Sequence, residues 1–139
     1  MKEVSSVDVN SSPTSSEGTY AESIVADELV RAGFLIVAKN FRLGHKEADL
    51  IALEGDTLCI IEVKGRSNAA LLRQPDVLIN RDKRREMIAI GTYFFKSHKA
   101  MGFRNLRFDF AFVLMPKSGE EPQIRYYRNA FLPAVTGTF

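Results

Sequence analysis

The sequence predicts a mixed α/β fold in which one central sheet is flanked by helices. The chain has 139 residues, 45% of them hydrophobic and 26% charged, which is ordinary for one soluble globular domain. Four stretches rich in Ile, Leu, Val and Phe have the length and alternation of strands. Two others carry apolar residues at helical spacing. Together they give the element order α-β-β-β-α-β, with room for an extra edge strand near the end.

Composition excludes several classes of protein. The net charge of +2 permits a polyanionic partner without requiring one, so the local distribution of charge matters more. The single cysteine, Cys59, excludes an internal disulfide and a cysteine-based zinc cluster. No apolar run approaches the roughly 18 residues of a transmembrane helix, and the N-terminus lacks the apolar region of a signal peptide. We therefore expect a cytoplasmic protein with no membrane partner.

The N-terminal part predicts a tail followed by a helix. Residues 1–18 are mostly small and polar without periodicity, and we expect a flexible tail. A helix should span about 19–32, with Gly33 as its C-terminal stop. The α/β domain then covers 19–128, and 129–139 form a C-terminal extension of unassigned role.

Three predicted strands follow this helix. Residues 34–41 begin with a nearly continuous apolar run, which favours a strand covered on both faces. Residues 46–54 and 57–64 form two alternating arms around Gly55-Asp56, a dipeptide suited to a two-residue hairpin turn. The middle of each arm is apolar, which indicates a central, buried hairpin.

The register of this hairpin brings four charged side chains to one face. If the residues flanking the turn pair with each other, counting outwards places Asp49 opposite Glu62 and Glu47 opposite Lys64. Directly opposed side chains have Cβ atoms about 4.5–5.5 Å apart, and like charges destabilise such a pair. The Asp49–Glu62 pair is therefore unfavourable unless a proton or a cation lies between the two carboxylates, and burial raises that cost.

These residue types point to a metal site. A hard divalent ion such as Mg²⁺ prefers oxygen ligands, takes one or two carboxylates and keeps several waters. Lys64 beside such an ion could orient a metal-bound water or stabilise the charge that develops on a phosphate. The alternative is a solvated strand face on which the same charges form salt bridges.

Several segments resemble a known family in their order and spacing. Asp49 followed by Glu62-Val63-Lys64 is similar to the PD-(D/E)xK nuclease motif, whose acidic residues and lysine bind metal and activate water. The wider pattern resembles the bacterial YraN-like family of predicted endonucleases over about residues 20–113. This resemblance implies a restriction-endonuclease-like fold, akin to that of archaeal Holliday-junction resolvases. The segments that carry it are AKNFR (38–42), EADLIA (47–52), IEVKGR (61–66) and RFD (107–109).

The resemblance implies a metal-dependent endonuclease that hydrolyses phosphodiester bonds in DNA, with branched or damaged DNA in repair or recombination as its setting. Asp49 and Glu62 would bind Mg²⁺ or Mn²⁺ together with the Val63 carbonyl, and Lys64 would orient or polarise the attacking water. The related nucleases also place a helix glutamate near the metal, here Glu22. By residue type alone, Glu22 is a first-turn acid that complements the helix dipole.

Three further charged residues are expected to support the site. By the register above, Glu47 should pair with Lys64, and direct metal ligation by Glu47 is its second interpretation. Arg107 and Asp109 match a family segment, and we expect them to fix the second helix by charge pairing.

A second helix is predicted over about 82–99, after a long connection over 65–80 of the kind that is often functional or mobile. Its N-cap is Asn80 or Asp82. Basic side chains gather in its first turns, where cations oppose the helix dipole unless an anion compensates them. A solvated face is the alternative to a DNA-binding role. The residues expected to hold a phosphate backbone are Arg66, Lys83, Arg84 and Arg85.

The last main strand is predicted over 106–114. Phe108, Phe110 and Phe112 alternate onto one face, which indicates core packing rather than a platform for stacked bases. A polar turn over 116–122 then leads to an edge strand over about 123–128.

Two alternatives to a nuclease stay open. A nucleic-acid- or partner-binding module could keep this fold without turnover, although a pure binder has no need to oppose two carboxylates. A purely structural ion network would instead predict that Asp49→Asn stabilises the fold. Junction resolvases work as dimers, so the resemblance also raises a homodimer as the assembly.

Overall fold

The computed structural model describes residues 16–66, 79–115 and 119–132. Residues 1–15 of the predicted tail, the connection over 67–78, the start of the polar turn and the end of the C-terminal extension lie outside these residues, whereas residues 16–18, also predicted as tail, belong to the first helix. The described chain has the predicted mixed α/β architecture, consistent with a restriction-endonuclease-like fold. In chain order its elements are α1 (Ser16–Arg31), β1 (Leu35–Leu43), β2 (Lys46–Glu54), β3 (Thr57–Arg66), α3 (Arg81–Ser97), a 3-10 helix (Lys99–Met101), β4 (Asn105–Leu114) and β5 (Gln123–Tyr127).

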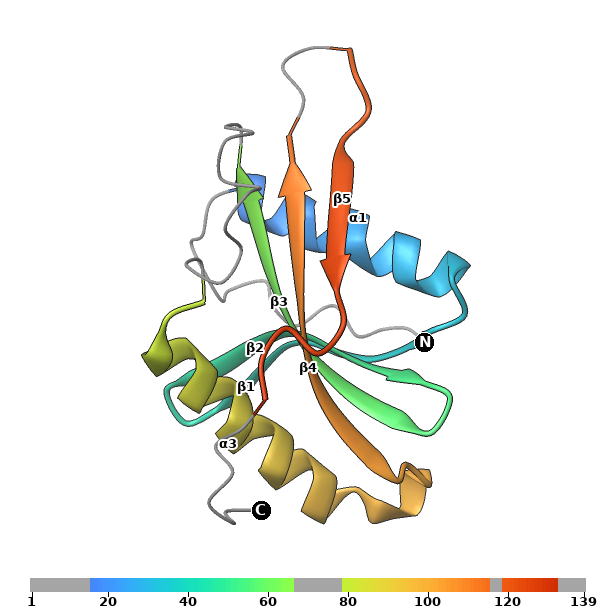
Figure 1. The fold of residues 1–139 in the computed structure, drawn as a ribbon, viewed down its shortest axis with the longest axis vertical. Coiled ribbons are helices and arrows are strands. Elements are labelled where there is room, and N and C mark those ends of the chain that lie inside the picture. Colours follow the sequence, from blue (N-terminus) through green and yellow to red (C-terminus); the bar gives the residue numbers. More distant parts are fainter. Residues whose placement is uncertain (1–15, 67–78, 116–118, 133–139) are drawn as a thin grey trace.

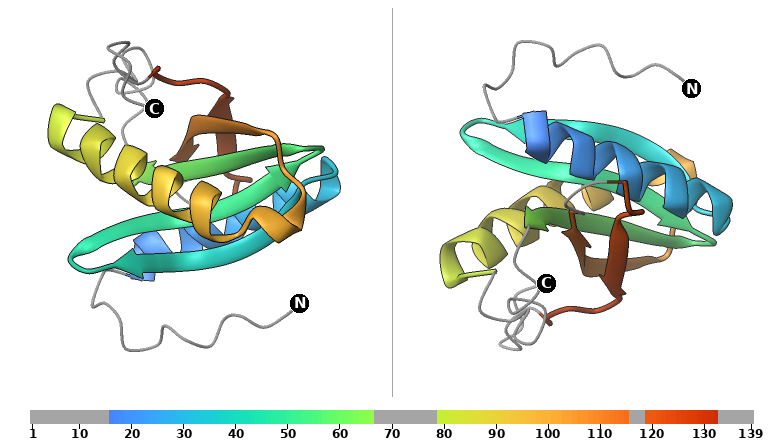
Figure 2. Two further views of the ribbon diagram at one scale, coloured as in Figure 1. Left: turned by 90° about the horizontal axis from the view of Figure 1, so that it is seen from below. Right: turned by 90° about the horizontal axis from the view of Figure 1, so that it is seen from above.

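One five-stranded sheet organises the molecule, in the order β1-β2-β3-β4-β5. β3 and β4 are parallel, and the other neighbouring pairs are antiparallel. Helix α1 packs against one face of the sheet and α3 against the other, each over its own apolar cluster (Figure 2). Figure 1 shows β3, β4 and β5 running together at one end, while the β1–β2 hairpin diverges from them. The gap that opens there between β2 and β3 positions the site described below.

Local sequence explains where both helices begin and end. α1 begins three residues earlier than predicted, and Gly33 ends it with a φ of +99°, a conformation that glycine adopts without strain. α3 follows Asn80, whose side-chain oxygen accepts a hydrogen bond from the Lys83 backbone N–H at 2.8 Å. Asn80 rather than Asp82 is therefore the N-cap.

The prediction that the first strand is covered on both faces was wrong. β1 is an edge strand whose residues are half-buried or exposed, and Leu35 is 56% exposed. Its apolar run serves two different clusters, because Ile36 packs on the α1 side while Val37 and Ala38 pack on the α3 side. A bulge between Ile36 and Ala38 accompanies this change of face.

The remaining strand predictions are confirmed. Phe108, Phe110 and Phe112 are almost completely buried between β4 and α3, so they are core residues. β5 forms the predicted edge strand beside β4. α3 approaches the sheet at Gly91, where an added Cβ would lie 3.0 Å from a Phe108 ring carbon. No helix among the described residues is long and apolar enough to cross a membrane.

Candidate functional site

The β2–β3 hairpin follows the predicted register only through its apolar part. Backbone pairing extends from the turn to the Leu50–Ile61 pair. Beyond that pair, the Asp49 side chain enters the gap between the strands, and its Oδ2 accepts a hydrogen bond from the Val63 N–H at 2.8 Å. The strands thus separate where the charged residues begin, and a carboxylate fills the place of the next ladder bond.

A group of carboxylates gathers around this gap; we call Glu22, Glu47, Asp49 and Glu62 the carboxylate cluster. Burial, together with the charges of Glu62 and Glu22, raises the pKa of Asp49 well above its usual value, against the opposing Val63 hydrogen bond. Burial also raises the pKa of Glu22, where the charges of Glu47 and Glu62 add to it. The structure therefore places the α1 glutamate close enough to Asp49, Glu47 and Glu62 to interact with all three. The cluster concentrates mutually repelling negative charge in a half-buried place.

Glu62 lies between two lysines at the centre of this cluster. It is 3% exposed, with Lys64 Nζ 3.2 Å from Oε2 and Lys83 Nζ 3.4 Å from Oε1. Oε1 is buried and accepts no hydrogen bond from the described part of the chain. The Lys83 ammonium instead donates to the Glu47 carbonyl oxygen at 3.0 Å and to Glu86 Oε1 at 3.1 Å. Glu62 Oε1 is thus close to a positive charge but keeps its lone pairs unused.

Asn40 on β1 is a site residue that sequence reasoning missed. Its backbone has φ +51°, a left-handed conformation that Asn tolerates better than most residues and that often marks functional sites. With the side-chain amide of Asn40 oriented so that its nitrogen faces the acceptor oxygens, the nitrogen donates to Glu22 Oε1 and Glu47 Oε2, each at 3.2 Å. Asn40 thereby joins an α1 carboxylate to a β2 carboxylate. The available signal was an Asn inside an apolar strand, within the segment AKNFR.

The expected pairing of Glu47 with Lys64 was wrong. Glu47 pairs across β1 with Arg42, whose Nη2 lies 3.7 Å from Glu47 Oε1. Lys64 pairs with Glu62 on its own strand. The predicted register does not extend to these residues because β2 and β3 separate beyond Leu50. Residues that would be opposite each other in a continued hairpin therefore no longer face each other.

The predicted basic patch is divided between two environments. Lys83 points into the carboxylate cluster, and the Arg84 Nε donates to the Ile79 carbonyl at 3.1 Å while its guanidinium lies over the Phe131 ring. Arg66 and Arg85 are exposed. Of the four basic residues expected to hold a phosphate backbone, these two are therefore the exposed ones.

Arg107 and Asp109 do not hold the second helix, so that expectation was wrong. They lie on the α1 side of β4, where Arg107 Nε and Nη2 each donate to Asp109 at 2.9 Å. Arg107 Nη2 also donates to Glu54 at 2.7 Å, and the Tyr126 hydroxyl donates to Asp109 at 2.6 Å. Strand alternation puts these residues on the face opposite the phenylalanines that contact α3. The network joins β2, β4 and β5.

Two members of the carboxylate cluster, Asp49 and Glu62, are of the type that a hard cation binds. Within the described ranges, no three Asp, Glu, His or Cys side chains are grouped closely enough to hold a metal ion together. Mg²⁺ needs only one or two carboxylates, because water completes its shell. Asp49 and Glu62 provide two, and the unused lone pairs of the buried Glu62 Oε1 are the observation that favours this fit.

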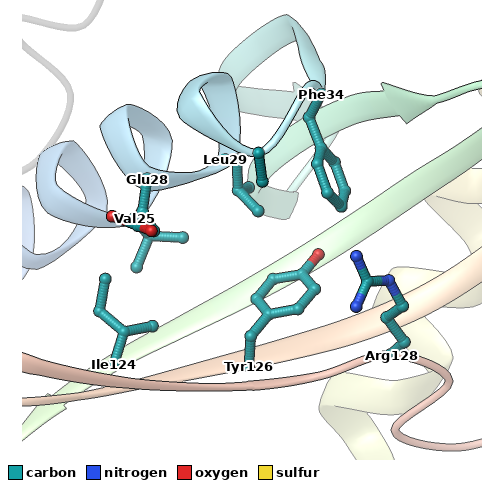
Figure 3. Close-up of a pocket in the computed structure, with 8 residues that line it drawn as sticks. Val25, Glu28, Leu29, Phe34, Ile124, Tyr126 and Arg128 are labelled. Atoms are coloured by element: carbon teal, nitrogen blue, oxygen red, sulfur yellow. The ribbon is translucent and has the colours of Figure 1, made fainter.

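A separate cavity of about 170 Å³ lies between the C-terminal half of α1 and β5 (Figure 3). Its walls are mainly apolar, and its polar lining side chains already have partners. Glu28 pairs with Arg31, the Tyr126 hydroxyl with Asp109, and Arg128 with Glu54. The cavity includes no member of the carboxylate cluster, and we assign it no function. Its residues are Val25, Glu28, Leu29, Ala32, Phe34, Ile124, Tyr126 and Arg128.

Comparison with known proteins places the chain in a family. A model described as "Uncharacterised protein family UPF0102" matches residues 21–113. The chain belongs to the UPF0102 family. A UPF0102 protein of Dictyoglomus thermophilum is 32% identical over 114 residues, which cover 82% of this chain and 95% of the relative. A UPF0102 protein of Renibacterium salmoninarum is 35% identical over 114 residues, covering 81% of this chain and 92% of the relative.

The UPF0102 match contains the whole carboxylate cluster together with Asn40, Lys64 and Lys83. It confirms the resemblance to the YraN-like family, whereas the likeness to the PD-(D/E)xK nucleases belongs to the proposal below. The names of these relatives state no activity, so a functional proposal for this UPF0102 protein rests on the geometry of its own site.

Proposed function

We propose that this protein is a divalent-metal-dependent endonuclease that hydrolyses phosphodiester bonds in DNA. The observation that carries the proposal is the meeting of Asp49 and Glu62 in the gap between β2 and β3. There a carboxylate with a raised pKa lies beside a buried oxygen that accepts no hydrogen bond within the described chain. Keeping like charges together in a buried place costs stability, and binding a cation would offset that cost.

Each residue of the site has a role in this proposal. Asp49, Glu62 and the Val63 carbonyl would hold Mg²⁺ or Mn²⁺, which when bound supplies Lewis-acid activation of water and charge neutralisation at the phosphate. Lys64, 3.2 Å from Glu62 Oε2, would orient the attacking water and stabilise negative charge as it develops. Glu22 contributes a further carboxylate from α1 that can hold water at the edge of the site.

Substrate binding would be electrostatic and largely independent of sequence. Arg66, at the end of β3, and Arg85, on the first turns of α3, are both exposed. Contacts from such side chains to phosphates weaken as salt rises. Branched or damaged DNA, a role in repair or recombination, and a homodimer are parts of this proposal that come from the resemblance to junction resolvases.

One observation favours a second candidate, a nucleic-acid- or partner-binding module without turnover. Lys64 and Lys83 both lie beside Glu62 and together supply positive charge without any metal. Such a module would bind DNA or another partner without cutting it.

Cleavage of labelled DNA separates the two candidates. Linear, nicked, flapped and four-way-junction substrates would be incubated with Mg²⁺ or Mn²⁺ and wild-type protein, Asp49→Ala or Lys64→Ala. Asp27→Ala on α1 and Lys96→Ala on α3 are matched controls at exposed positions. The nuclease requires metal-dependent cutting that both site variants lose and both controls keep. Binding without cutting under every metal would establish the module instead.

A further inference from the structure

We propose that Lys83 is an internal counter-ion of the carboxylate cluster, and that a divalent cation binding at Asp49 and Glu62 displaces it from Glu62. Lys83 would then set how tightly the site binds metal, in addition to any contact with DNA. This inference rests on the proposed metal site and deepens it by naming the residue with which the metal competes.

The surroundings of Lys83 are those of a bound cation. Its ammonium lies 3.0 Å from the Glu47 carbonyl oxygen on β2, 3.1 Å from Glu86 Oε1 on α3 and 3.4 Å from Glu62 Oε1 on β3. All three are oxygen atoms, and they come from three different elements. The Lys83 side chain is only 22% exposed, so its charge acts on the cluster with limited screening by water.

The contact with Glu62 differs from the other two. The ammonium donates hydrogen bonds to the Glu47 carbonyl and to Glu86, whereas Glu62 Oε1 accepts none from the described residues. The interaction with Glu62 is therefore one of charge without a directed bond. A stronger cation can take Glu62 Oε1 without breaking either hydrogen bond of Lys83.

Glu86 provides the alternative partner that displacement requires. It lies one turn after Lys83 on the same helix and is more exposed than Glu62: the exposed fraction of the side chain is 34% for Glu86 and 4% for Glu62. An ammonium repelled by a divalent ion can stay bonded to Glu86 and to the Glu47 carbonyl while it moves away from Glu62 Oε1. The metal and the Lys83–Glu62 contact thus exclude each other, although Lys83 keeps a partner in both states.

Metal affinity in the absence of DNA tests this inference directly. Mn²⁺ binding to the metal-free full chain would be measured by calorimetry for wild type, Lys83→Met and Lys96→Met. Methionine keeps much of the lysine side-chain volume without its charge, and Lys96 is an exposed lysine on the same helix, outside the site. We expect Lys83→Met to bind Mn²⁺ at least roughly tenfold more tightly than wild type, because a nearby unit charge opposes a divalent ion at partly buried sites. Lys96→Met should bind within about twofold of wild type, since exposed charges are screened.

Thermal unfolding supplies a second readout. Without metal, Lys83→Met should have a lower Tm than wild type, because the cluster loses its counter-ion, and Mn²⁺ should raise the Tm of the variant by more than that of wild type. Lys83→Gln keeps a hydrogen-bond donor for the Glu47 carbonyl and serves if Lys83→Met does not fold.

The outcomes separate this inference from the proposed function. If wild type binds Mn²⁺ and Lys83→Met or Lys83→Gln binds it equally or less tightly, Lys83 does not compete and the inference is wrong, while the metal site stands. If neither wild type nor any variant binds Mn²⁺, the metal site itself is wrong and the inference falls with it.

Discussion

Two buried carboxylates on adjacent strands, Asp109 of β4 and Glu62 of β3, have opposite surroundings. Both oxygens of Asp109 accept hydrogen bonds, from Arg107, the Tyr126 hydroxyl and the Asn129 N–H. Glu62 has charged neighbours, but its Oε1 accepts no hydrogen bond from the residues that the structure describes. Both residues are almost completely buried. The two carboxylates are buried to a similar extent, but they differ in how many of their oxygens accept hydrogen bonds.

This difference separates a structural network from a site. A buried charge whose hydrogen bonds are complete holds the elements around it together, and removing one partner leaves another charge buried and unpaired. A buried charge with unused lone pairs costs stability until something else binds to it. We therefore assign the Asp109 network to the fold, and the carboxylate cluster is the site of the proposed function.

The largest expected effect comes from breaking the hydrogen-bond network around Asp109. Asp109→Ala should lower the free energy of unfolding by about 3–5 kcal/mol, because it leaves the Arg107 guanidinium without its buried carboxylate. Urea unfolding measures this loss. Asp27→Ala, at an exposed position of α1, should change stability by less than about 0.5 kcal/mol. If Asp109→Ala loses less than about 1 kcal/mol, Asp109 does not hold the fold together, and the contrast between Asp109 and Glu62 is wrong.

Removing a charge from the carboxylate cluster should have the opposite effect and raise the free energy of unfolding. Asp49→Asn keeps an oxygen for the Val63 N–H but removes a charge that repels Glu62 and Glu22. We expect the metal-free variant to be more stable than wild type by about 0.5–2 kcal/mol, the usual size of a stabilising substitution, and to lose cleavage. Denaturant unfolding and the DNA assay check the two parts. A purely structural ion network predicts the same stabilisation, so the loss of cleavage is the part that distinguishes the nuclease. A variant that is less stable than wild type would show that Asp49 contributes to the fold as Asp109 does.

Asn40 tests whether backbone strain is stored at the carboxylate cluster. Glycine at this position adopts φ +51° without strain, whereas alanine does not, so Asn40→Ala should be less stable than Asn40→Gly by about 1 kcal/mol. Both variants lose the amide that joins Glu22 and Glu47, and both should bind Mn²⁺ more weakly than wild type. If thermal unfolding shows that the two variants are equally stable, the backbone at Asn40 is not strained.

The smallest effect concerns the outer part of the Asp109 network and depends on pH. Hydrogen bonds from Arg128, and then from Arg107, lower the pKa of Glu54 from 4.5 to about 2. Because the folded-state pKa is depressed, the stabilisation is fully present above pH 4.5 and is lost as pH falls towards 2. Glu54→Gln should therefore flatten the fall in stability between pH 5 and 3, as followed by urea unfolding. Glu28→Gln, which breaks an exposed pair with Arg31, should leave that slope unchanged.

The local sequence was enough to predict the elements and the centre of the site. Strand alternation and the Gly55-Asp56 turn gave the correct register for the apolar half of the hairpin, and so brought Asp49 and Glu62 to neighbouring strands. Capping chemistry at Asn80 and Gly33 marked helix ends, because these signals depend only on nearby backbone groups.

Tertiary structure alone decided which charges meet. The gap between β2 and β3 separated Glu47 from Lys64 and let the Asp49 side chain enter between the strands. The packing of α3 across the sheet turned Lys83 inwards to Glu62, although on the sequence it belonged to a run of basic residues. Periodicity assigns a side chain to a face of its own element. Its partners depend on where other elements pass, and those contacts join residues far apart in the chain.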